Sequence, residues 1–397
     1  MTNRLEHSKS TWPIFGIFLT LTAFGVSTNA IPPLITTIAD RLGVSYANFG
    51  CIIMFQFTSF FVAGIVGGWI CERYNVNSRT FVLAGLLLVG LTFLVGSTLT
   101  RLTWFAVWTI PLGFGGGLTE TFGSVLISRH DKPNSSKLLN LSQVFFCIGA
   151  ICAPLVVALM LYIGMPWRHI FVLFGLFMLL VLCIFACLTG KQSQVVANPV
   201  HIAKNSSAPL LKDSLFVLLA ATILIYVTFE SLVTCWISVY FEMQLSCPIP
   251  YSALRLSIFW IGVIAGRLAI TLLPRRVSLW PAMFAGVSMM CLGAVLASLT
   301  HSPTWATVFV FLNGLGAGPV WPATVAIGHS ARNRPRFTSS LIGVGAFGVV
   351  LGSGLGPLIF RYLDYSLFFP SIALGCIILL GLGIFSYREN SKTHNAG

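Results

Sequence analysis

The chain has 397 residues, of which 56% are hydrophobic and only 8% are charged, and its mean hydropathy is +0.90. Soluble domains carry roughly 25% charged residues, so this composition argues against a soluble globular enzyme. The formal net charge is +13, but the Lys and Arg residues stand singly or in small groups between apolar blocks. Nucleic-acid binding needs them clustered on one face, so we expect no nucleic-acid partner.

The apolar residues form blocks of about 20 with almost no charge, the length that crosses a bilayer core of roughly 30 Å as a helix. Breaks at Pro, Gly and charged residues give twelve such blocks. They cover residues 12–36, 48–70, 80–99, 104–127, 138–163, 168–189, 214–240, 252–273, 278–299, 304–328, 338–360 and 366–387. We predict an all-α membrane protein with twelve transmembrane helices.

The longest polar stretch inside the chain, residues 190–212, separates six blocks from six. A run of three alternating glycines in the fourth block recurs in the tenth, and a Gly of the fifth block recurs in the eleventh. These glycines are Gly113, Gly115, Gly117 and Gly149, then Gly314, Gly316, Gly318 and Gly352. Transporters are commonly built from repeated bundles with substrate held between them. We predict two pseudo-symmetric six-helix bundles, 1–189 and 213–397, joined by a cytoplasmic linker at 190–212.

The orientation follows from the basic residues in the loops. With a cytoplasmic N-terminus, the inside loops and tails hold seventeen Lys and Arg residues and the outside loops hold five. Basic residues are enriched on the cytoplasmic side. We therefore expect both termini in the cytoplasm and the chain in the bacterial inner membrane.

The sequence lacks the usual signatures of enzyme chemistry. It contains no phosphate-binding loop, no zinc-protease motif and no nucleophile elbow. Its ten cysteines lack CxxC spacing and are typical of small buried hydrophobes rather than of a metal site or a disulfide framework. We expect no enzyme activity, no cofactor and no metal site, and we favour a coupled or facilitated carrier.

Three charged residues, Glu120, Glu230 and Arg267, lie well inside the blocks. A charge at membrane depth costs at least ~2.5 kcal/mol on insertion scales, so it needs a partner, water or a function. A carboxyl group in a dry environment favours its neutral form and can bind and release a proton as solvent access alternates. We predict that Glu120 and Glu230 couple protons. The alternatives are a permanent Glu120–Arg267 pair and, for Arg267, either a grip on an anionic substrate or a structural counter-ion.

Neutral polar and aromatic residues inside the blocks complete a predicted binding surface. Amides both donate and accept hydrogen bonds, as a polyhydroxylated solute requires, although bonding between helices explains any single one equally well. Trp236 offers either a ring for the apolar face of a sugar or an interfacial anchor. The candidate substrate contacts are Asn29, Gln56, Glu120, Asn140, Gln143, Trp236, Arg267 and Asn313.

The segment from Gly68 through Glu72 and Arg73 to Arg79 resembles the loop motif between helices 2 and 3 of the major facilitator superfamily, with Asn75 where that family has Gly. The resemblance covers essentially the whole chain. It implies the major facilitator fold and a gating or structural role for Gly68, Glu72 and Arg73.

Within the superfamily, the sequences of residues 117–121 and 139–151 closely resemble the fucose and glucose proton symporter group. Residues 259–267 and the pattern Gly-Pro-x-x-Pro at 318–322 resemble sugar carriers, and Trp321 inside that pattern becomes a further candidate contact. The resemblance implies that Glu120 handles protons and sugar. One departure is in helix 1, where a Pro of the Pro32-Pro33 pair stands at the place of an Asp in the fucose carriers.

These observations predict a secondary active transporter that moves a monosaccharide or a similar small polar solute by alternating access, with proton symport. One alternative is a proton-coupled efflux antiporter for drugs or metabolites. It is favoured by residues 149–154, which resemble a degraded form of a Gly-Pro motif often associated with antiporters, and by the 32 Phe residues, several of which could line an apolar cavity. The other alternative is a non-transporting receptor or scaffold. The expected partners are a small-molecule substrate, the proton and the lipid bilayer, and the expected state is a monomer.

Overall fold

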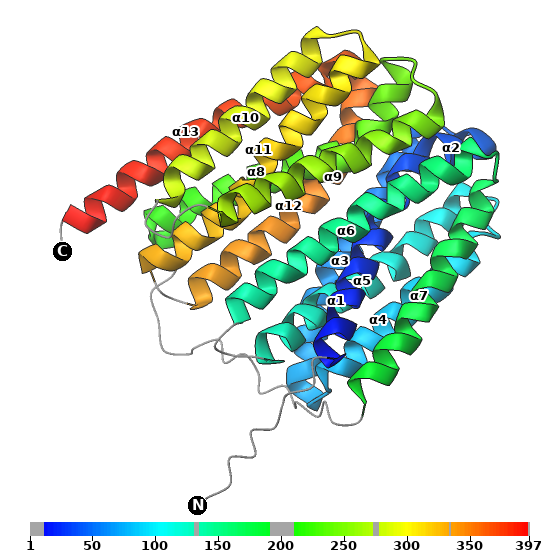
Figure 1. Cartoon of the computed structure of the whole chain (residues 1–397), viewed down its shortest axis with the longest axis horizontal. Coiled ribbons are helices and arrows are strands. Elements are labelled where there is room, and N and C mark those ends of the chain that lie inside the picture. Colours follow the sequence, from blue (N-terminus) through cyan, green and yellow to red (C-terminus); the bar gives the residue numbers. More distant parts are fainter. Residues whose placement is uncertain (1–11, 131–134, 191–209, 273–277, 333–334, 396–397) are drawn as a thin grey trace, which may run out of the picture.

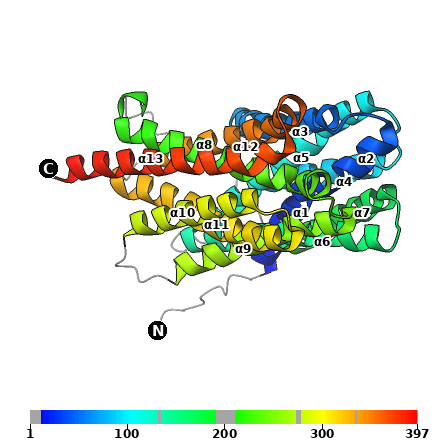
Figure 2. The ribbon, with the colours of Figure 1, turned by 90° about the horizontal axis from the view of Figure 1, so that it is seen from above.

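The computed structural model describes residues 12–130, 135–190, 210–272, 278–332 and 335–395. This described part is built from helices joined by short turns (Figure 1). The predicted linker at 190–212 falls mostly on residues 191–209, which lie outside the described residues. Two six-helix bundles follow each other along the chain and lie side by side (Figure 2).

The first half contains α1 (Trp12–Asn29), η1 (Pro32–Leu34), α2 (Ile35–Leu42), α3 (Tyr46–Tyr74), α4 (Ser78–Gly96), α5 (Leu102–His130), α6 (Ser135–Tyr162) and α7 (Trp167–Thr189). The second half contains η3 (Leu210–Lys212), α8 (Ser214–Met243), α9 (Ile249–Thr271), α10 (Leu279–Leu299), α11 (Pro303–Arg332), α12 (Pro335–Tyr362), η4 (Tyr365–Leu367) and α13 (Phe368–Asn395). The prediction of an all-α membrane protein is confirmed, and the described residues form the twelve long helices expected when α1 and α2, which share one predicted block, count as one.

Eleven helical stretches within the described ranges are long and apolar enough to cross a membrane. The remaining helix, α5, contains Glu120 and several glycines and packs against both α3 and α4. The first predicted block is interrupted at Pro32-Pro33, where the chain forms η1 before continuing as α2. Proline has no backbone N–H and disturbs a helix interior, which accounts for this break.

The two halves repeat the same packing scheme. In the first half α1 packs on α6 and α7, α5 packs on α3 and α4, and α4 packs on α7. In the second half α8 packs on α12 and α13, α11 packs on α9 and α10, and α10 packs on α13. The corresponding helices therefore occupy corresponding places, as the internal repetition of the sequence predicted.

The repeated glycines explain why these helix pairs approach so closely. A Cβ at Gly113 would overlap the backbone carbonyl of Gln56 in α3, and a Cβ at the matching Gly314 would overlap the carbonyl of Phe259 in α9. Small residues let backbones come into contact, and close packing stabilises helix pairs where no hydrophobic driving force exists. The glycine repeat is thus a repeat of contacts as well as of sequence.

Two seams join the halves, α3 against α12 and α6 against α9. We call the end where α1 begins and α13 ends the terminal end, and the opposite end the far end (Figure 1). Toward the far end Trp236 of α8 packs against Gly50 of α3, and the Ser257 hydroxyl of α9 donates to the Ile151 carbonyl of α6 at 2.7 Å. The contacts described here between the halves therefore lie toward the far end, which they close.

Candidate functional site

A cavity of about 230 Å³ lies between the two halves near the middle of the molecule. Helices of both halves contribute polar and aromatic side chains to its wall. These side chains, some of them predicted contacts and some not, include Thr28, Asn29, Glu120, Gln143, Glu230, Ser231, Thr234, Trp260, Arg267 and Trp321. Pockets for drug-sized ligands measure roughly 300–1,000 Å³, so this cavity suits a smaller solute.

Glu120 is the carboxyl group that the first half contributes to the cavity. Its neighbour Thr119 donates to the Gly115 carbonyl at 2.9 Å and lies in close contact with Gly85 of α4. Successive helix residues point about 100° apart, so the packing of Thr119 on α4 leaves Glu120 turned toward the cavity. Within the described part of the chain Glu120 forms no hydrogen bond or ion pair, so the alternative of a permanent pair with Arg267 is not formed in this structure.

Glu230 and Arg267 lie on neighbouring helices of the second half and interact electrostatically. The Glu230 Oε1 atom is 2.8 Å from the Tyr226 hydroxyl, and that hydroxyl is also 2.9 Å from the Ala317 carbonyl oxygen of α11. The Arg267 Nη1 atom donates to the Cys147 Sγ atom of α6 at 3.2 Å. Arg267 therefore contacts the opposite half.

Asn29 and Trp260 bridge the two halves at the edge of the cavity. The Trp260 Nε1 atom donates to the Asn29 Oδ1 atom at 2.8 Å, and the Asn29 Nδ2 atom donates to the Gly25 carbonyl at 2.9 Å. The Trp260 ring also meets Phe146 edge to face at 5.4 Å. In the sequence, Trp260 belonged only to a family pattern and was not predicted as a contact. An apolar block does not indicate which of its aromatic rings contacts the other half.

Three candidates lie away from the cavity. Trp236 is fully buried and donates to the Ser353 carbonyl of α12 at 3.0 Å, so it is neither an interfacial anchor nor a lining residue in this structure. Asn313 is also buried and donates to the Met290 carbonyl at 2.7 Å. Gln56 is buried where α3 meets Gly113 of α5. The Trp236 and Asn313 side chains therefore join helices, and the contact of Gln56 with α5 is made by its backbone.

Asn140 belongs to α6, but its side chain lies outside the described residues. The predicted loop residues Glu72 and Arg73 are exposed in the last turn of α3, at the terminal end. Asn75 follows that turn with φ of 52°, a left-handed conformation that Gly and Asn adopt most readily. This explains why Asn replaces the Gly of the family pattern.

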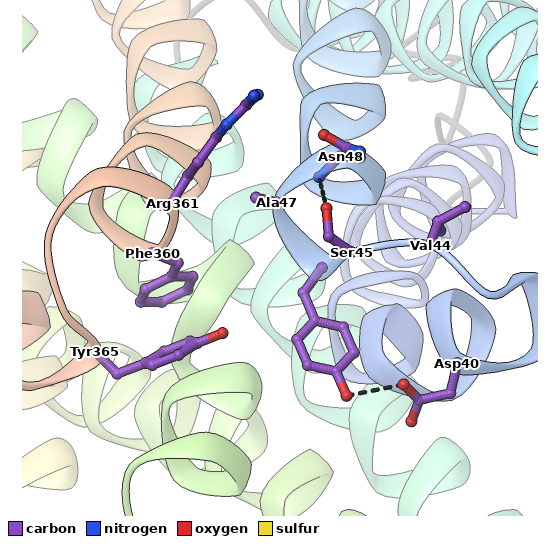
Figure 3. Close-up of a pocket in the computed structure, with 9 residues that line it drawn as sticks. Asp40, Val44, Ser45, Ala47, Asn48, Phe360, Arg361 and Tyr365 are labelled. Atoms are coloured by element: carbon purple, nitrogen blue, oxygen red, sulfur yellow. Dashed lines mark hydrogen bonds between the residues drawn. The ribbon is translucent and has the colours of Figure 1, made fainter.

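A second hollow of about 530 Å³ opens at the far end, where both halves reach the surface (Figure 3). The Tyr46 hydroxyl donates to the Asp40 Oδ1 atom at 2.8 Å on the side of the first half. Phe360, Arg361 and Tyr365 line the opposite side. None of our candidates lines this hollow, and Asp40, which does line it, is not part of the cavity wall.

The comparisons with known proteins agree with this geometry. A sequence model of the Major Facilitator Superfamily matches residues 15–344. The chain therefore belongs to the major facilitator superfamily and is a multi-pass membrane transporter.

Similar curated proteins cover nearly the full length. The glucose/mannose transporter GlcP of Bacillus subtilis (strain 168) is 26% identical over 94% of this chain and 90% of its own. A TsgA homolog of Buchnera aphidicola subsp. Baizongia pistaciae (strain Bp) is 21% identical over 87% of this chain and 89% of its own. Among solved structures, a D-xylose-proton symporter superposes with a TM-score of 0.75, at 14% identity, over 94% of this chain and 97% of its own.

Proposed function

We propose that this protein is a proton-coupled symporter of a monosaccharide or a similar small polar solute. The observation on which the proposal rests is a single cavity, closed toward the far end, that combines two carboxyl groups, an arginine, amides and indole rings. Amides and hydroxyls exchange hydrogen bonds with sugar hydroxyls, and aromatic rings cover the apolar face of a sugar. The similarity to GlcP supports the same substrate class.

Glu120 is our candidate for the transported proton. It lies in the cavity without a fixed partner among the described residues, so water from either side can exchange its proton when access alternates. Asn29, Gln143, Glu230, Arg267, Trp260 and Trp321 are the proposed substrate-facing residues. We further propose that both termini and the linker at 190–212 are cytoplasmic, that the membrane is the bacterial inner membrane, and that the protein acts as a monomer with halves 1–189 and 213–397.

The test is proton movement into proteoliposomes that contain the purified protein and an internal pH dye. Monosaccharides are added outside, then organic anions and lipophilic cations, one class at a time. Acidification with a sugar establishes symport. Proton movement with amphipathic compounds alone establishes efflux exchange, and sugar flux without proton movement establishes uniport, so either result contradicts the proposal.

The matched variant is Glu120→Gln, which keeps the shape of the side chain and removes the titratable proton. We expect it to abolish accumulation against a gradient while sugar exchange across the membrane continues. Full accumulation by this variant would remove Glu120 from the mechanism.

A further inference from the structure

The hydroxyl of Tyr226 has too few hydrogens for the two oxygens it meets. It carries one hydrogen, yet it lies 2.8 Å from the Glu230 Oε1 atom and 2.9 Å from the Ala317 carbonyl oxygen. Both distances are those of ordinary O–H···O hydrogen bonds. If Glu230 were ionised, both oxygens would be acceptors and one contact would have no hydrogen.

A protonated Glu230 satisfies both contacts. The carboxylic acid donates its hydrogen to the Tyr226 oxygen, and Tyr226 donates its own hydrogen to Ala317. Tyr226 is fully buried and Glu230 partly so, and buried polar groups are rarely left unpaired. The arrangement of oxygens therefore fits the neutral acid.

The position of Arg267 fits the same protonation state. Its guanidinium donates to the Cys147 thiol across the α6–α9 seam at 3.2 Å, and no ion pair joins it to Glu230 within the described ranges. A thiol is a weak acceptor, whereas an ionised carboxylate forms short and strong bonds with guanidinium. An ionised Glu230 within electrostatic reach would compete successfully for Arg267.

We propose that Arg267 is a positioning residue that links the two halves only while Glu230 is protonated. When Glu230 releases its proton to water in the cavity, its carboxylate takes the guanidinium and the bond to Cys147 breaks. Arg267 stays charged throughout, and the only covalent bond broken is the O–H bond of Glu230. Proton binding thereby favours the arrangement of α6 and α9 seen here, since a ligand shifts a population toward the state that binds it better.

The titratable groups that face Glu230 are Tyr226 on its own helix, Arg267 on α9 and Cys147 on α6. Glu120 contributes to the same cavity from α5. The proposal rests on the proposed proton coupling, but proton binding can be measured without any transport. Its failure and the failure of symport are therefore distinguishable.

The experiment measures the distance between spin labels on exposed positions of the two helices that form this seam, Leu141→Cys in α6 and Leu272→Cys directly after α9. The background replaces the exposed cysteines Cys51, Cys152, Cys183 and Cys187 with Ser. Double electron–electron resonance then gives the distribution of label distances at acidic and at alkaline pH. In the protein without further substitutions we expect a different distribution at each pH. Glu230→Gln, which stays neutral, should show the acidic distribution at both pH values.

Substitution of Cys147, which accepts the hydrogen bond from Arg267, tests the contact between α6 and α9 directly. Cys147→Ala should lower the proportion of the acidic arrangement about threefold at acidic pH, as expected for loss of one modest hydrogen bond. Cys147→Ser, which keeps an acceptor, should restore it. Cys376→Ala removes a buried thiol of α13 away from the seam and should change nothing.

A full pH response in Glu230→Gln would overturn the proposal, as would a Cys147→Ala variant that behaves like Cys376→Ala. Sugar-driven proton influx combined with either result would leave the proposed function intact and reject the switch. Absence of proton influx with the expected shifts would reject symport and retain the switch.

Discussion

At the scale of single residues, buried carboxyl groups set the most specific constraints on this molecule. Glu242 at the far end of α8 is only 8% exposed and faces Thr36 of α2 in the other half, with Asp40 nearby. Its Oε1 atom has no hydrogen-bond partner within the described residues, and no cation there acts on this carboxyl group. A buried charge without a partner costs free energy that the unfolded chain does not pay.

We expect Glu242→Gln to stabilise the protein at alkaline pH by about 1–3 kcal/mol, because the amide occupies the same buried place without a charge. The reason is that ionisation of Glu242 destabilises only the folded state, so the cost appears as pH rises. At acidic pH, where Glu242 is already neutral, the variant should match the unmodified protein. Thermal unfolding in detergent at both pH values measures this difference.

The control for this prediction is Glu72→Gln, which removes an exposed carboxyl group at the end of α3. It should leave the unfolding temperature unchanged at both pH values. An equal effect of the two substitutions, or a destabilised Glu242→Gln variant at alkaline pH, would contradict the interpretation of Glu242 as a buried acid without a counter-ion.

At the scale of helices, the repeated glycines make matching predictions in the two halves. A Cβ at Gly149 would overlap the Thr22 carbonyl of α1, and a Cβ at Gly352 would overlap the Thr228 carbonyl of α8. Gly149→Ala and Gly352→Ala should each lower stability by about 1–3 kcal/mol, because neither backbone can move without disturbing its bundle.

Gly343→Ala provides the matched control, since the added Cβ would meet nothing within 4 Å. Alanine favours a helix over glycine by up to about 1 kcal/mol, so this variant should be neutral or slightly more stable. The unfolding temperatures of the three variants in detergent measure the contrast. A similar loss at all three positions would show that the effect is not one of backbone contact.

The helices and their repetition could be predicted from the sequence because both depend only on the order of residue types along the chain. Apolar blocks reveal the spans, and recurring glycines reveal pairs of helices that touch. Hydropathy also gives the depth of Glu120 and Arg267. It does not give the direction in which a side chain points from its helix.

That missing direction explains how the candidate residues divide. Gln143 lines the cavity, whereas Gln56 and Asn313, which are also amides inside apolar blocks, are buried away from it. Asn313 bonds to the Met290 carbonyl of a neighbouring helix. Trp260 was overlooked for the same reason, since its hydrogen bond to Asn29 joins residues of opposite halves. Contacts across the seam depend on how the bundles meet, which no local pattern encodes.

At the scale of the whole molecule, alternating access requires the far end to open, and the polar contacts of α9 oppose that movement. Trp260 bonds to Asn29 of α1 at 2.8 Å, and Ser257 bonds to the Ile151 carbonyl of α6 at 2.7 Å. Because both bonds join opposite halves, rocking of one bundle against the other must break them. They therefore stabilise the arrangement with a closed far end.

Trp260→Phe keeps a ring that can meet Phe146 but removes the indole N–H. Loss of one hydrogen bond of about 1 kcal/mol shifts a two-state equilibrium about fivefold, so we expect more molecules with an open far end. Hydrogen exchange without substrate should then rise near residues 30–48 and 356–366 and fall at the terminal ends of α3 and α12. Trp108→Phe removes a buried indole bond to the Thr92 carbonyl within one half, so it should lower stability without this redistribution. If both variants change exchange alike, the Trp260 bond contributes to folding rather than to the balance between the two states.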